Sequence, residues 1–401
     1  MTATLLVVDA GSSTVKLAAY DVRGLDVVSS TASHLVAPSS GTQIPRRIAR
    51  AHAELPDEQR SIAFNAMLSS FLEQNAISDV RAVAHRIVHG GISFSASCVL
   101  DAVAERALLA LRELAPLHLP IALDWVTLCR GIFGPDVPQI AVFDTAFFAA
   151  LPAVAQHYAI PLDLQKTHGM RRFGFHGAAH DSMLRRVQHL RPDLDRGGRI
   201  ISIQLGAGCS IAAIDRGVPQ DTSMGFSPLE GLVMSTRSGD IDAGLVTFLE
   251  RTAGFAPERL ERVLNMESGL LGLSGLSGDM RTLLASKSRD AEFAIELYCY
   301  RIRKYIGAYI AVLGGIDVIV FGGGVGEHSP EVRERVLAGM EWCGVTIDHD
   351  RNDAARGTEE IDTRISISRG SVDVWVVAVD EGAVLAREAA AVLQGRANDN
   401  L

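Results

Sequence analysis

Three glycine-rich turns are the first places in this sequence where chemistry could occur. Gly11-Ser12-Ser13 and Gly206-Ala207-Gly208 each separate two β-branched runs, and Gly322-Gly323-Gly324 follows a third. Backbone N–H groups in such turns can converge on an anion, because glycine accepts unusual dihedral angles and adds no side chain. A single turn of this kind is usually only a tight hairpin. Three of them favour phosphate binding, and Lys16 is either a phosphate ligand or a solvated surface lysine.

Isolated charges in apolar or glycine-rich surroundings are the next candidates. Arg86 follows the apolar run 80–84 and precedes Gly-Gly, which is typical of a strand end, and arginine grips carboxylate or phosphate through two hydrogen bonds. An ion pair with a nearby acid is an equal alternative. Asp144 lies in an apolar stretch, where a charge is costly unless it is paired or metal-linked, so a functional acid and a buried ion pair both stay open. His176 follows Arg171-Arg172 in a Gly/aromatic context, and a satisfied core histidine is equally compatible.

The segment 221–242 is the densest in small, polar and charged residues, and it contains Arg237. Its lack of an amphipathic period, together with its Met, Phe and Leu residues, predicts a functional loop rather than a plain surface loop.

Short apolar strands alternate with helices, which predicts an α/β protein. The expected strands are 5–8, 15–20, 200–205, 211–214, 316–321 and 372–379. The expected helices are 57–75, 101–113, 293–313, 331–340 and 382–394. The two strand–turn–strand segments lie half a chain apart and indicate an internal duplication. Segment 25–45 is expected to be mostly surface loop.

Composition excludes several classes of function. A chain of 401 residues is expected to form two domains. Its net charge is −9 and it has no run of basic residues, so we do not expect it to bind nucleic acid. The five cysteines form no CxxC pair, which is typical of thiols in a reducing compartment. No signal peptide and no apolar stretch of membrane-spanning length is present, so we expect a cytoplasmic protein.

These motifs together resemble the acetate kinase family, and they occur in the family's order across nearly the whole chain. The matching blocks are 10–16, 85–91, 142–147, 172–177, 221–231, 236–242 and 324–327. The resemblance implies an α/β protein of two ribonuclease H-like, actin-like ATPase domains, with the active site in the interdomain cleft. It places the first domain at 1–144 plus 383–401 and the second at 145–382, and it implies a homodimer.

The resemblance also implies roles for individual residues. Arg86 and Arg237 would clamp the carboxylate and the transferring phosphoryl group, His176 would stabilise the transition state, and Asp144 is the active-site acid. Mg²⁺, or Mn²⁺ in its place, would lie at Asp9 and Glu381. The residues that would hold ATP or ADP are Lys16, Gln204, Leu205, Gly206, Ala207, Gly208, Asp279, Met280, Arg281, Gly324, Val325, Gly326, Glu327 and His328.

Four departures from the family pattern fall in these motifs. Asp9 stands where relatives usually have Asn, Phe148 replaces a common His, and His328 replaces an Asn. The usual His-Leu-Gly-Asn-Gly-Ser-Ser is Gln-Leu-Gly-Ala-Gly-Cys-Ser at 204–210. Gly324 would keep the adenosine pocket open, which favours ATP over pyrophosphate as the donor.

The expected reaction is reversible in-line transfer of the ATP γ-phosphoryl group to acetate, giving acetyl phosphate and ADP. A carboxylate is already ionised at pH 7, so alignment and charge neutralisation suffice for catalysis. One alternative is a kinase for propionate or another short-chain carboxylate, with Val88 and Phe175 expected to line the pocket. The others are a non-kinase ATPase of the same superfold and a nucleotide-binding paralogue without turnover.

Overall fold

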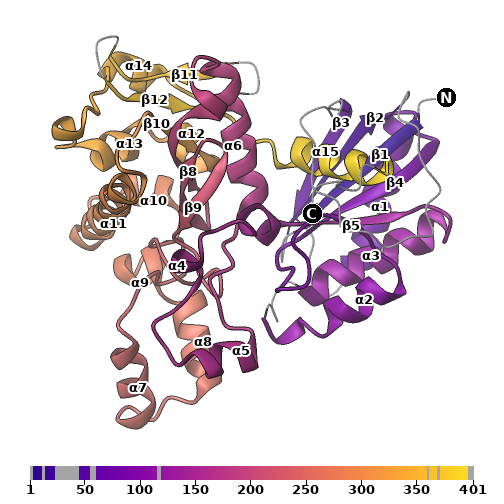
Figure 1. Ribbon diagram of the computed structural model, residues 1–401, viewed down its shortest axis with the longest axis horizontal. Coiled ribbons are helices and arrows are strands. Elements are labelled where there is room, and N and C mark those ends of the chain that lie inside the picture. Colours follow the sequence, from indigo (N-terminus) through magenta and orange to yellow (C-terminus); the bar gives the residue numbers. More distant parts are fainter. Residues whose placement is uncertain are drawn as a thin grey trace. The chain divides into compact units, whose positions relative to one another are not determined.

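The described residues of this computed structural model are 3–10, 14–22, 45–54, 60–114, 119–358, 361–367 and 371–395. The chain divides into two compact units, called unit 1 (Met1–Ala149 with Asp380–Leu401) and unit 2 (Ala150–Val379). Each unit contains one six-stranded sheet (Figure 1). The domain boundaries expected after residues 144 and 382 stay a prediction.

The strands of the two sheets have the same order and the same directions. Unit 1 contains β1 (Ala3–Ala10), β2 (Thr14–Asp21), β3 (Arg46–Glu54), β4 (Asp79–Ile87), β5 (Cys98–Val99) and β6 (Gln139–Phe143). Unit 2 contains β7 (Arg199–Leu205), β8 (Cys209–Asp215), β9 (Val218–Thr222), β10 (Val318–Gly322), β11 (Thr363–Arg364) and β12 (Asp373–Val376).

The order β3-β2-β1-β4-β6-β5 in unit 1 is repeated as β9-β8-β7-β10-β12-β11 in unit 2. In both sheets the first three strands form an antiparallel meander, and the next two run parallel to the first strand. A short antiparallel strand closes the far edge of each. The predicted α/β class and internal duplication are confirmed.

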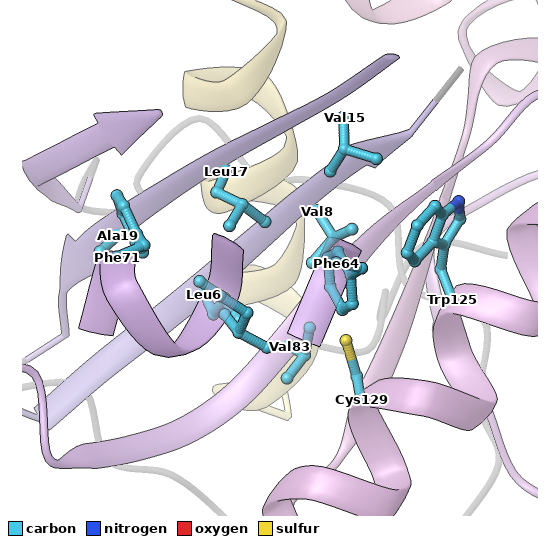
Figure 2. Packing of buried hydrophobic residues seen from close by; sticks show 11 residues of the cluster. Leu6, Val8, Val15, Leu17, Ala19, Phe64, Phe71, Val83, Trp125 and Cys129 are labelled. Carbon is cyan, nitrogen blue, oxygen red and sulfur yellow. The ribbon is translucent and has the colours of Figure 1, made fainter. Parts of the chain in front are cut away.

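Alternation along the central strands separates the two faces of the unit 1 sheet. One face packs against α1 (Arg60–Gln74) and α3 (Leu119–Phe133), and Figure 2 shows this cluster. Its buried members are Leu6, Val8, Val15, Leu17, Ala19, Phe64, Leu68, Phe71, Val83, Trp125 and Cys129. The last described helix, α15 (Glu381–Leu393), packs against β1, β4 and β6.

The unit 2 sheet lies between two long helices. The helix α6 (Gly177–Leu190) packs against β7 and β10, and α11 (Arg289–Leu313) packs against β7, β8 and β9. The helix α6 covers the unit 2 sheet but follows β6 of unit 1 in the chain. In the same way, α15 covers the unit 1 sheet but follows β12 of unit 2. None of the described helices combines the length and apolar character that a membrane crossing needs.

Several expectations about single elements need correction. The segment after β10 is not an open loop, because residues 323–328 form the short helix α12 (Gly323–His328), followed directly by α13 (Pro330–Leu337). Ser329 and Pro330 predict an N-cap followed by a first helical turn, and α13 does begin at Pro330, but the Ser329 side chain makes no capping hydrogen bond. Phe293, the first residue of the expected apolar helix 293–313, is 53% exposed, because it lies on the face of α11 away from the buried residues Ala291, Ala294 and Ile295. The expected surface loop falls almost wholly on residues 23–44, outside the described residues.

The other described α-helices are α2 (Ala102–Leu109), α4 (Ala153–Gln156), α5 (Leu162–His168), α7 (Ala243–Arg251), α8 (Pro257–Met266), α9 (Gly269–Ser274), α10 (Met280–Leu284) and α14 (His349–Ala354). Of these, α2 corresponds to the helix expected at 101–113, and the rest were not predicted from the sequence.

Candidate active site

In unit 1, the parallel strands bring charged residues to one edge of the sheet. Asp9 is the second-last residue of β1, Arg86 the second-last of β4, and Asp144 follows β6 directly. Lys16 on β2 lies opposite Asp9 in the antiparallel register, and Glu381 begins α15. All five predicted residues of this unit therefore meet in one cluster, called the charged cluster.

Arg86 is the centre of the charged cluster. Its Nε lies 3.1 Å from both carboxylate oxygens of Asp144, and its Nη2 donates to Asp144 Oδ2 at 2.8 Å. Its Nη1 lies 3.2 Å from Asp9 Oδ1 and 3.1 Å from Glu381 Oε1. Lys16 Nζ lies 3.2 Å from Asp9 Oδ2 and 3.2 Å from Glu381 Oε2. Two cations are thus held by three carboxylates.

The ionisation of these groups is mutually dependent. Asp9 first and Glu381 second raise the pKa of Lys16. Burial opposes the charge on Arg86, but Asp144, Glu381 and Asp9 outweigh it and raise its pKa. Burial likewise opposes ionisation of Glu381, and Arg86 and Lys16 overcome this, so its pKa is lowered. Asp144 is only 1% exposed, and burial raises its pKa above the ordinary value although Arg86 counteracts it.

Asp9 and Glu381 supply carboxylate oxygens, the type of donor that Mg²⁺ prefers. Both carboxylates contact the same two cations, so their oxygens face a common space. Within the described ranges, no cluster of three or more potential metal-ligating side chains occurs. Mg²⁺ is commonly held by only one or two carboxylates together with substrate phosphates.

In unit 2, the equivalent edge of the sheet is a glycine-rich turn between β7 and β8. Gly206 N–H donates to Gly208 O at 3.0 Å, which closes the turn, and Ser235 N–H donates to Ala207 O at 3.0 Å. A Cβ built on Gly208 would lie 3.2 Å from His176 Nε2 and 3.8 Å from Arg237 Nη1. The imidazole and the guanidinium therefore converge on the turn, and glycine leaves room between them.

Arg237 has a different environment from Arg86. Within the described residues no carboxylate lies within ion-pair distance, and its Nη1 donates only to the carbonyl oxygen of Pro228 at 3.1 Å and weakly to Met234 Sδ at 4.0 Å. Burial lowers its pKa by removing hydration, and the interaction with Cys209 offsets this only in part. A half-buried arginine without an acidic partner is suited to bind an anionic substrate.

His176 occupies the N-cap of α6 with φ 58° and ψ 30°, a left-handed conformation that is uncommon for residues with a side chain. Such backbone geometry costs free energy and often marks a functional position. The ring nitrogen Nδ1 lies 2.9 Å from Ser210 Oγ, the first hydroxyl of a buried polar chain that continues to His180.

Partly buried polar contacts hold the segment 221–242 in place. Tyr158 donates its hydroxyl to Glu230, and Arg172 Nη2 donates to the same carboxylate at 2.5 Å. Asp240 accepts from Gly231 N at 2.8 Å and from Tyr305 Oη at 2.7 Å. The predicted functional loop is thus rigidly tied to α11 and to the chain before α6.

The second glycine turn of unit 2 lies beside the first. A Cβ on Gly323, whose φ is +77°, would lie 2.6 Å from Leu205 O and 2.7 Å from Gln204 Nε2. Glu327 Oε1 accepts from Gly323 N at 2.9 Å and from Val379 N at 3.1 Å, so this acid closes the turn. A Cβ on Gly324 would meet nothing within 4 Å, which agrees with the open space expected there.

The remaining predicted nucleotide residues connect to the first turn through Ser235. Ser235 Oγ donates to Gly278 O at 2.8 Å, next to Asp279, which caps α10 by accepting from Arg281 N at 2.8 Å. Arg281 also pairs with Asp279, with Nη2 and Oδ2 2.6 Å apart, and its side chain is 91% exposed. Met280 is buried, whereas His328 is exposed at the end of α12.

Sequence reasoning missed Arg333, which is fully buried beneath α12. Its guanidinium donates to Gly326 O at 2.8 Å, Asn352 Oδ1 at 2.8 Å and Asn352 O at 2.7 Å, and at 3.1 and 3.2 Å to Glu327 O and Ala355 O. Since these partners lie up to 22 residues away in the chain, no local pattern signals them. His180 was also missed, although its spacing of four residues from His176 on one helix was a readable signal.

The two α/β units share one ribonuclease H-like strand order. One sheet ends in the charged cluster, and the other ends in glycine turns beside an arginine. This combination defines an actin-like two-domain ATPase fold. The acetokinase family model matches residues 4–387, so the chain belongs to the acetate kinase family.

Individual relatives agree with this membership. The acetate kinase of Solibacter usitatus is 42% identical over 331 residues, which cover 82% of this chain and 79% of that protein. The crystal structure of Porphyromonas gingivalis acetate kinase matches with a TM-score of 0.81 and 35% identity, covering 98% of this chain and 100% of the other. A propionate kinase structure from Francisella tularensis matches with a TM-score of 0.82 and 31% identity, covering 96% and 98%.

Proposed function

We propose that this protein is an acetate kinase that transfers the γ-phosphoryl group of ATP to acetate, reversibly, giving acetyl phosphate and ADP. One acetate oxygen forms a bond to the γ-phosphorus while the bond from that phosphorus to the β,γ-bridging oxygen breaks, and ADP leaves with that oxygen. No proton needs to be removed, because the carboxylate is ionised at neutral pH. The residues therefore have to align two anions and neutralise charge on the moving group.

The observation that carries the proposal is the convergence of Arg237 and His176 on Gly208. Arg237 supplies a half-buried positive charge that has no acidic partner among the described residues, and His176 supplies a directed ring nitrogen. Donors fixed in advance of the reaction can stabilise charge that develops on transferring phosphoryl oxygens. We assign the phosphoryl group to these two side chains.

Arg86 and Asp144 are proposed to act on the carboxylate side of the reaction. The two-fold hydrogen bond to Asp144 fixes the plane of the guanidinium, so Asp144 orients Arg86 rather than removing a proton. Lys16 and the two turns of unit 2, with residues 279–281 and 324–328, are proposed to hold the nucleotide.

Mg²⁺ is the proposed cofactor, with Asp9 and Glu381 as its protein ligands, and Mn²⁺ is the proposed substitute because it also prefers oxygen donors. When bound, the ion supplies positive charge that neutralises phosphate oxygens. This chain's Lys16 and Arg86 occupy the same carboxylates and would have to share them with the ion.

Propionate is the second candidate substrate, favoured by the similarity to the Francisella propionate kinase. One methylene group changes transition-state binding by only about 1–3 kcal/mol, so both acids can be substrates. Phe175, which is buried, and the half-buried Val88 are the proposed pocket residues.

Two further properties are proposed with the activity. A homodimer is supported by large apolar side chains on the packed helices α7 and α8, where Leu245, Phe248 and Met266 are 46%, 49% and 57% exposed. Light scattering after size exclusion would give twice the chain mass, and a concentration-independent monomer would contradict it. A cytoplasmic location is supported by five free cysteines.

The decisive experiment is hydroxylamine trapping of acyl phosphate from ATP, Mg²⁺ and acetate, propionate or butyrate, with Arg237→Ala in parallel. We expect acetohydroxamate from the wild type and at least about a 1,000-fold loss in the variant, because a transition-state donor is removed. No product with any acid, from folded protein that still binds ATP, would refute the kinase proposal and favour a nucleotide-binding protein without turnover.

A further inference from the structure

Four polar side chains form a continuous buried chain behind the glycine turn of unit 2. From His176 Nδ1 it passes to Ser210 Oγ at 2.9 Å, from there to His180 Nε2 at 2.7 Å, and from His180 Nδ1 to Ser202 Oγ at 2.8 Å. Ser202, His180 and Ser210 are each 0% exposed. Buried polar groups of this kind cost free energy unless every hydrogen bond is made, so their arrangement is tightly constrained.

The charge state of His180 restricts the direction of these bonds. Burial lowers its pKa to about 3, so the ring is neutral at physiological pH and carries one proton. One ring nitrogen is then a donor and the other an acceptor. Because each nitrogen faces a serine hydroxyl, one serine must donate to His180 and the other must accept from it.

The two directions differ in where the single hydroxyl proton of Ser202 goes. It lies either in the 2.8 Å bond to His180 Nδ1 or towards Met183 Sδ at 3.7 Å, in which case Ser202 accepts from His180 Nδ1–H. In the first direction Ser202 donates to His180, His180 Nε2–H donates to Ser210, and the Ser210 hydroxyl donates to His176 Nδ1. Only this direction leaves the proton of His176 on Nε2, where it can be donated to an anion.

We propose that Ser202, His180 and Ser210 form a relay that fixes the tautomer of His176 with its proton on Nε2. The assignment of the phosphoryl group to that nitrogen rests on the proposed function, whereas the tautomer itself is a property of the folded chain. Nε2 is the nitrogen that faces the Gly208 turn and Arg237. A neutral His176 then donates to an anionic oxygen without first taking a proton from solvent.

The relay gives its members a positioning role rather than direct contact with substrate. If Ser210 could not donate, the neutral ring of His176 could move its proton to Nδ1 and present a lone pair to the phosphoryl oxygens. Two facing lone pairs repel, so the fraction of enzyme ready for transfer would fall. The left-handed backbone at His176 holds the ring in place but cannot choose between the tautomers.

Nitrogen NMR of the full-length protein labelled with ¹⁵N-histidine tests the relay without any turnover. The His176 signals are assigned by their loss in His176→Asn. In the wild type we expect an unprotonated, pyridine-type Nδ1 and a protonated, pyrrole-type Nε2. Ser210→Ala should shift both signals towards values averaged between tautomers, whereas Ser366→Ala, a matched buried serine of unit 2, should leave them unchanged.

A protonated Nδ1 in the wild type, or an unchanged pattern in folded Ser210→Ala, would overturn the proposal. Ser202→Ala provides the same test from the far end of the relay if Ser210→Ala does not fold. These readouts stay informative even if the protein makes no acyl phosphate, so failure of the relay and failure of the proposed function are distinguishable.

Kinetics supply the second readout. Loss of an orienting partner of a functional histidine typically costs about 10- to 100-fold in activity. We expect Ser202→Ala and Ser210→Ala to lower kcat by that factor while the KM for acetate changes less than about threefold. Restoration of the hydroxyl in Ser202→Thr should recover most of kcat. An unchanged kcat in Ser202→Ala, or a loss confined to KM, would contradict a relay acting on the transition state.

Discussion

The two sheets share one strand order, yet the residues at their functional edges have opposite electrostatic character. In unit 1, Asp9 and Arg86 are the second-last residues of their strands and belong to a network of three carboxylates and two cations. In unit 2, the equivalent strand ends carry Gln204 and Gly322, and the nearby Arg237 has no acidic partner among the described residues. The same topology therefore presents a pre-neutralised cluster in one unit and an uncompensated positive charge in the other.

This difference shows that the strand topology determines where functional residues lie, whereas the side chains at those positions determine which ligands and reactions they suit. Parallel strands deliver their carboxyl ends to one edge, which suits ligand binding in α/β sheets. Charges paired within the protein are costly to separate, whereas an arginine without a partner can exchange water for a substrate anion. The comparison predicts that equivalent mutations in the two units have different consequences for stability and activity.

Replacement of Arg237 and replacement of Arg86 should differ most in their effects on stability. Arg237→Ala should abolish acyl phosphate formation, by at least about 1,000-fold, with a change in unfolding free energy below about 1 kcal/mol, because no carboxylate loses its partner. Arg86→Ala should abolish activity and also destabilise the fold by about 3–5 kcal/mol, because buried Asp144 is left unpaired. Urea unfolding and hydroxamate assays check both, and equal stability losses would break the comparison.

Arg333 should contribute more to stability than any other cation of unit 2. Arg333→Met removes five hydrogen bonds and leaves the carbonyl oxygens of Gly326, Glu327, Asn352 and Ala355 without that donor. We expect a loss of about 3–5 kcal/mol and weaker ATP binding, since α12 loses its support. Denaturant unfolding and nucleotide titration measure these effects, with exposed Arg281→Met as the matched stability control; equal losses would contradict the structural role.

Each unit also contains a buried histidine whose pKa is lowered. Burial lowers the pKa of His85 to about 4 and that of His180 to about 3. Below the unfolded-state pKa of about 6.5, the unfolded chain binds a proton that the folded chain does not, so stability falls as pH falls. The slope is about 1.4 kcal/mol per pH unit for each histidine, and it ends near the folded-state pKa.

Replacement of either histidine should therefore flatten the pH dependence. Between pH 6.5 and 5, the unfolding free energy of His85→Gln should fall by about 2 kcal/mol less than that of the wild type. The comparison uses the change with pH, so a pH-independent loss of stability caused by the substitution cancels. His180→Gln should show the same slope change but extend it below pH 4. Urea midpoints at four pH values measure this, and parallel curves for wild type and variants would show that the histidines titrate normally.

The smallest expected effect concerns the space between Arg237 and His176. Gly208→Ala places a Cβ 3.2 Å from the His176 ring, tighter than most real contacts, so we expect kcat to fall about 10-fold with little loss of stability. Gly307→Ala is the control, because its Cβ would meet nothing within 4 Å in the middle of α11. That variant should gain about 0.5–1 kcal/mol in stability and keep full activity. A fully active Gly208→Ala would show that the turn tolerates a side chain.

Sequence patterns predicted the duplication and the strands β1, β2, β7, β8, β10 and β12, because these strands are buried along most of their length and appear as short apolar runs. Both hairpins were visible as β-branched runs around small residues, and each appears as an antiparallel pair. The helical turn at 323–328 was not visible, because three glycines give no helical preference. It forms because Gly323 can adopt φ +77° and Glu327 reaches back to its N–H.

The candidate residues were recognisable by type, but their partners were not. Asp144 was expected to be paired or metal-linked, and only the folded chain identifies Arg86 as the partner with two parallel hydrogen bonds. Lys16 was expected to be free for phosphate or solvated, whereas it contacts two carboxylates. The partners in these contacts are separated by 58 and by 365 positions in the chain, and contacts over such separations leave no periodic pattern in a single sequence.

The sequence by itself determined the elements, the duplication and the identities of the reactive side chains, because these follow from local periodicity and residue chemistry. Tertiary structure alone decided which arginine is neutralised and which stays uncompensated, and it joined Ser202, His180 and Ser210 behind His176. The physical reason is that charge pairing and hydrogen-bond direction depend on distances between strands and helices that are remote in the chain. Burial strengthens electrostatic interactions and raises the cost of unpaired polar groups, so small differences in these distances produce large differences in pKa and stability.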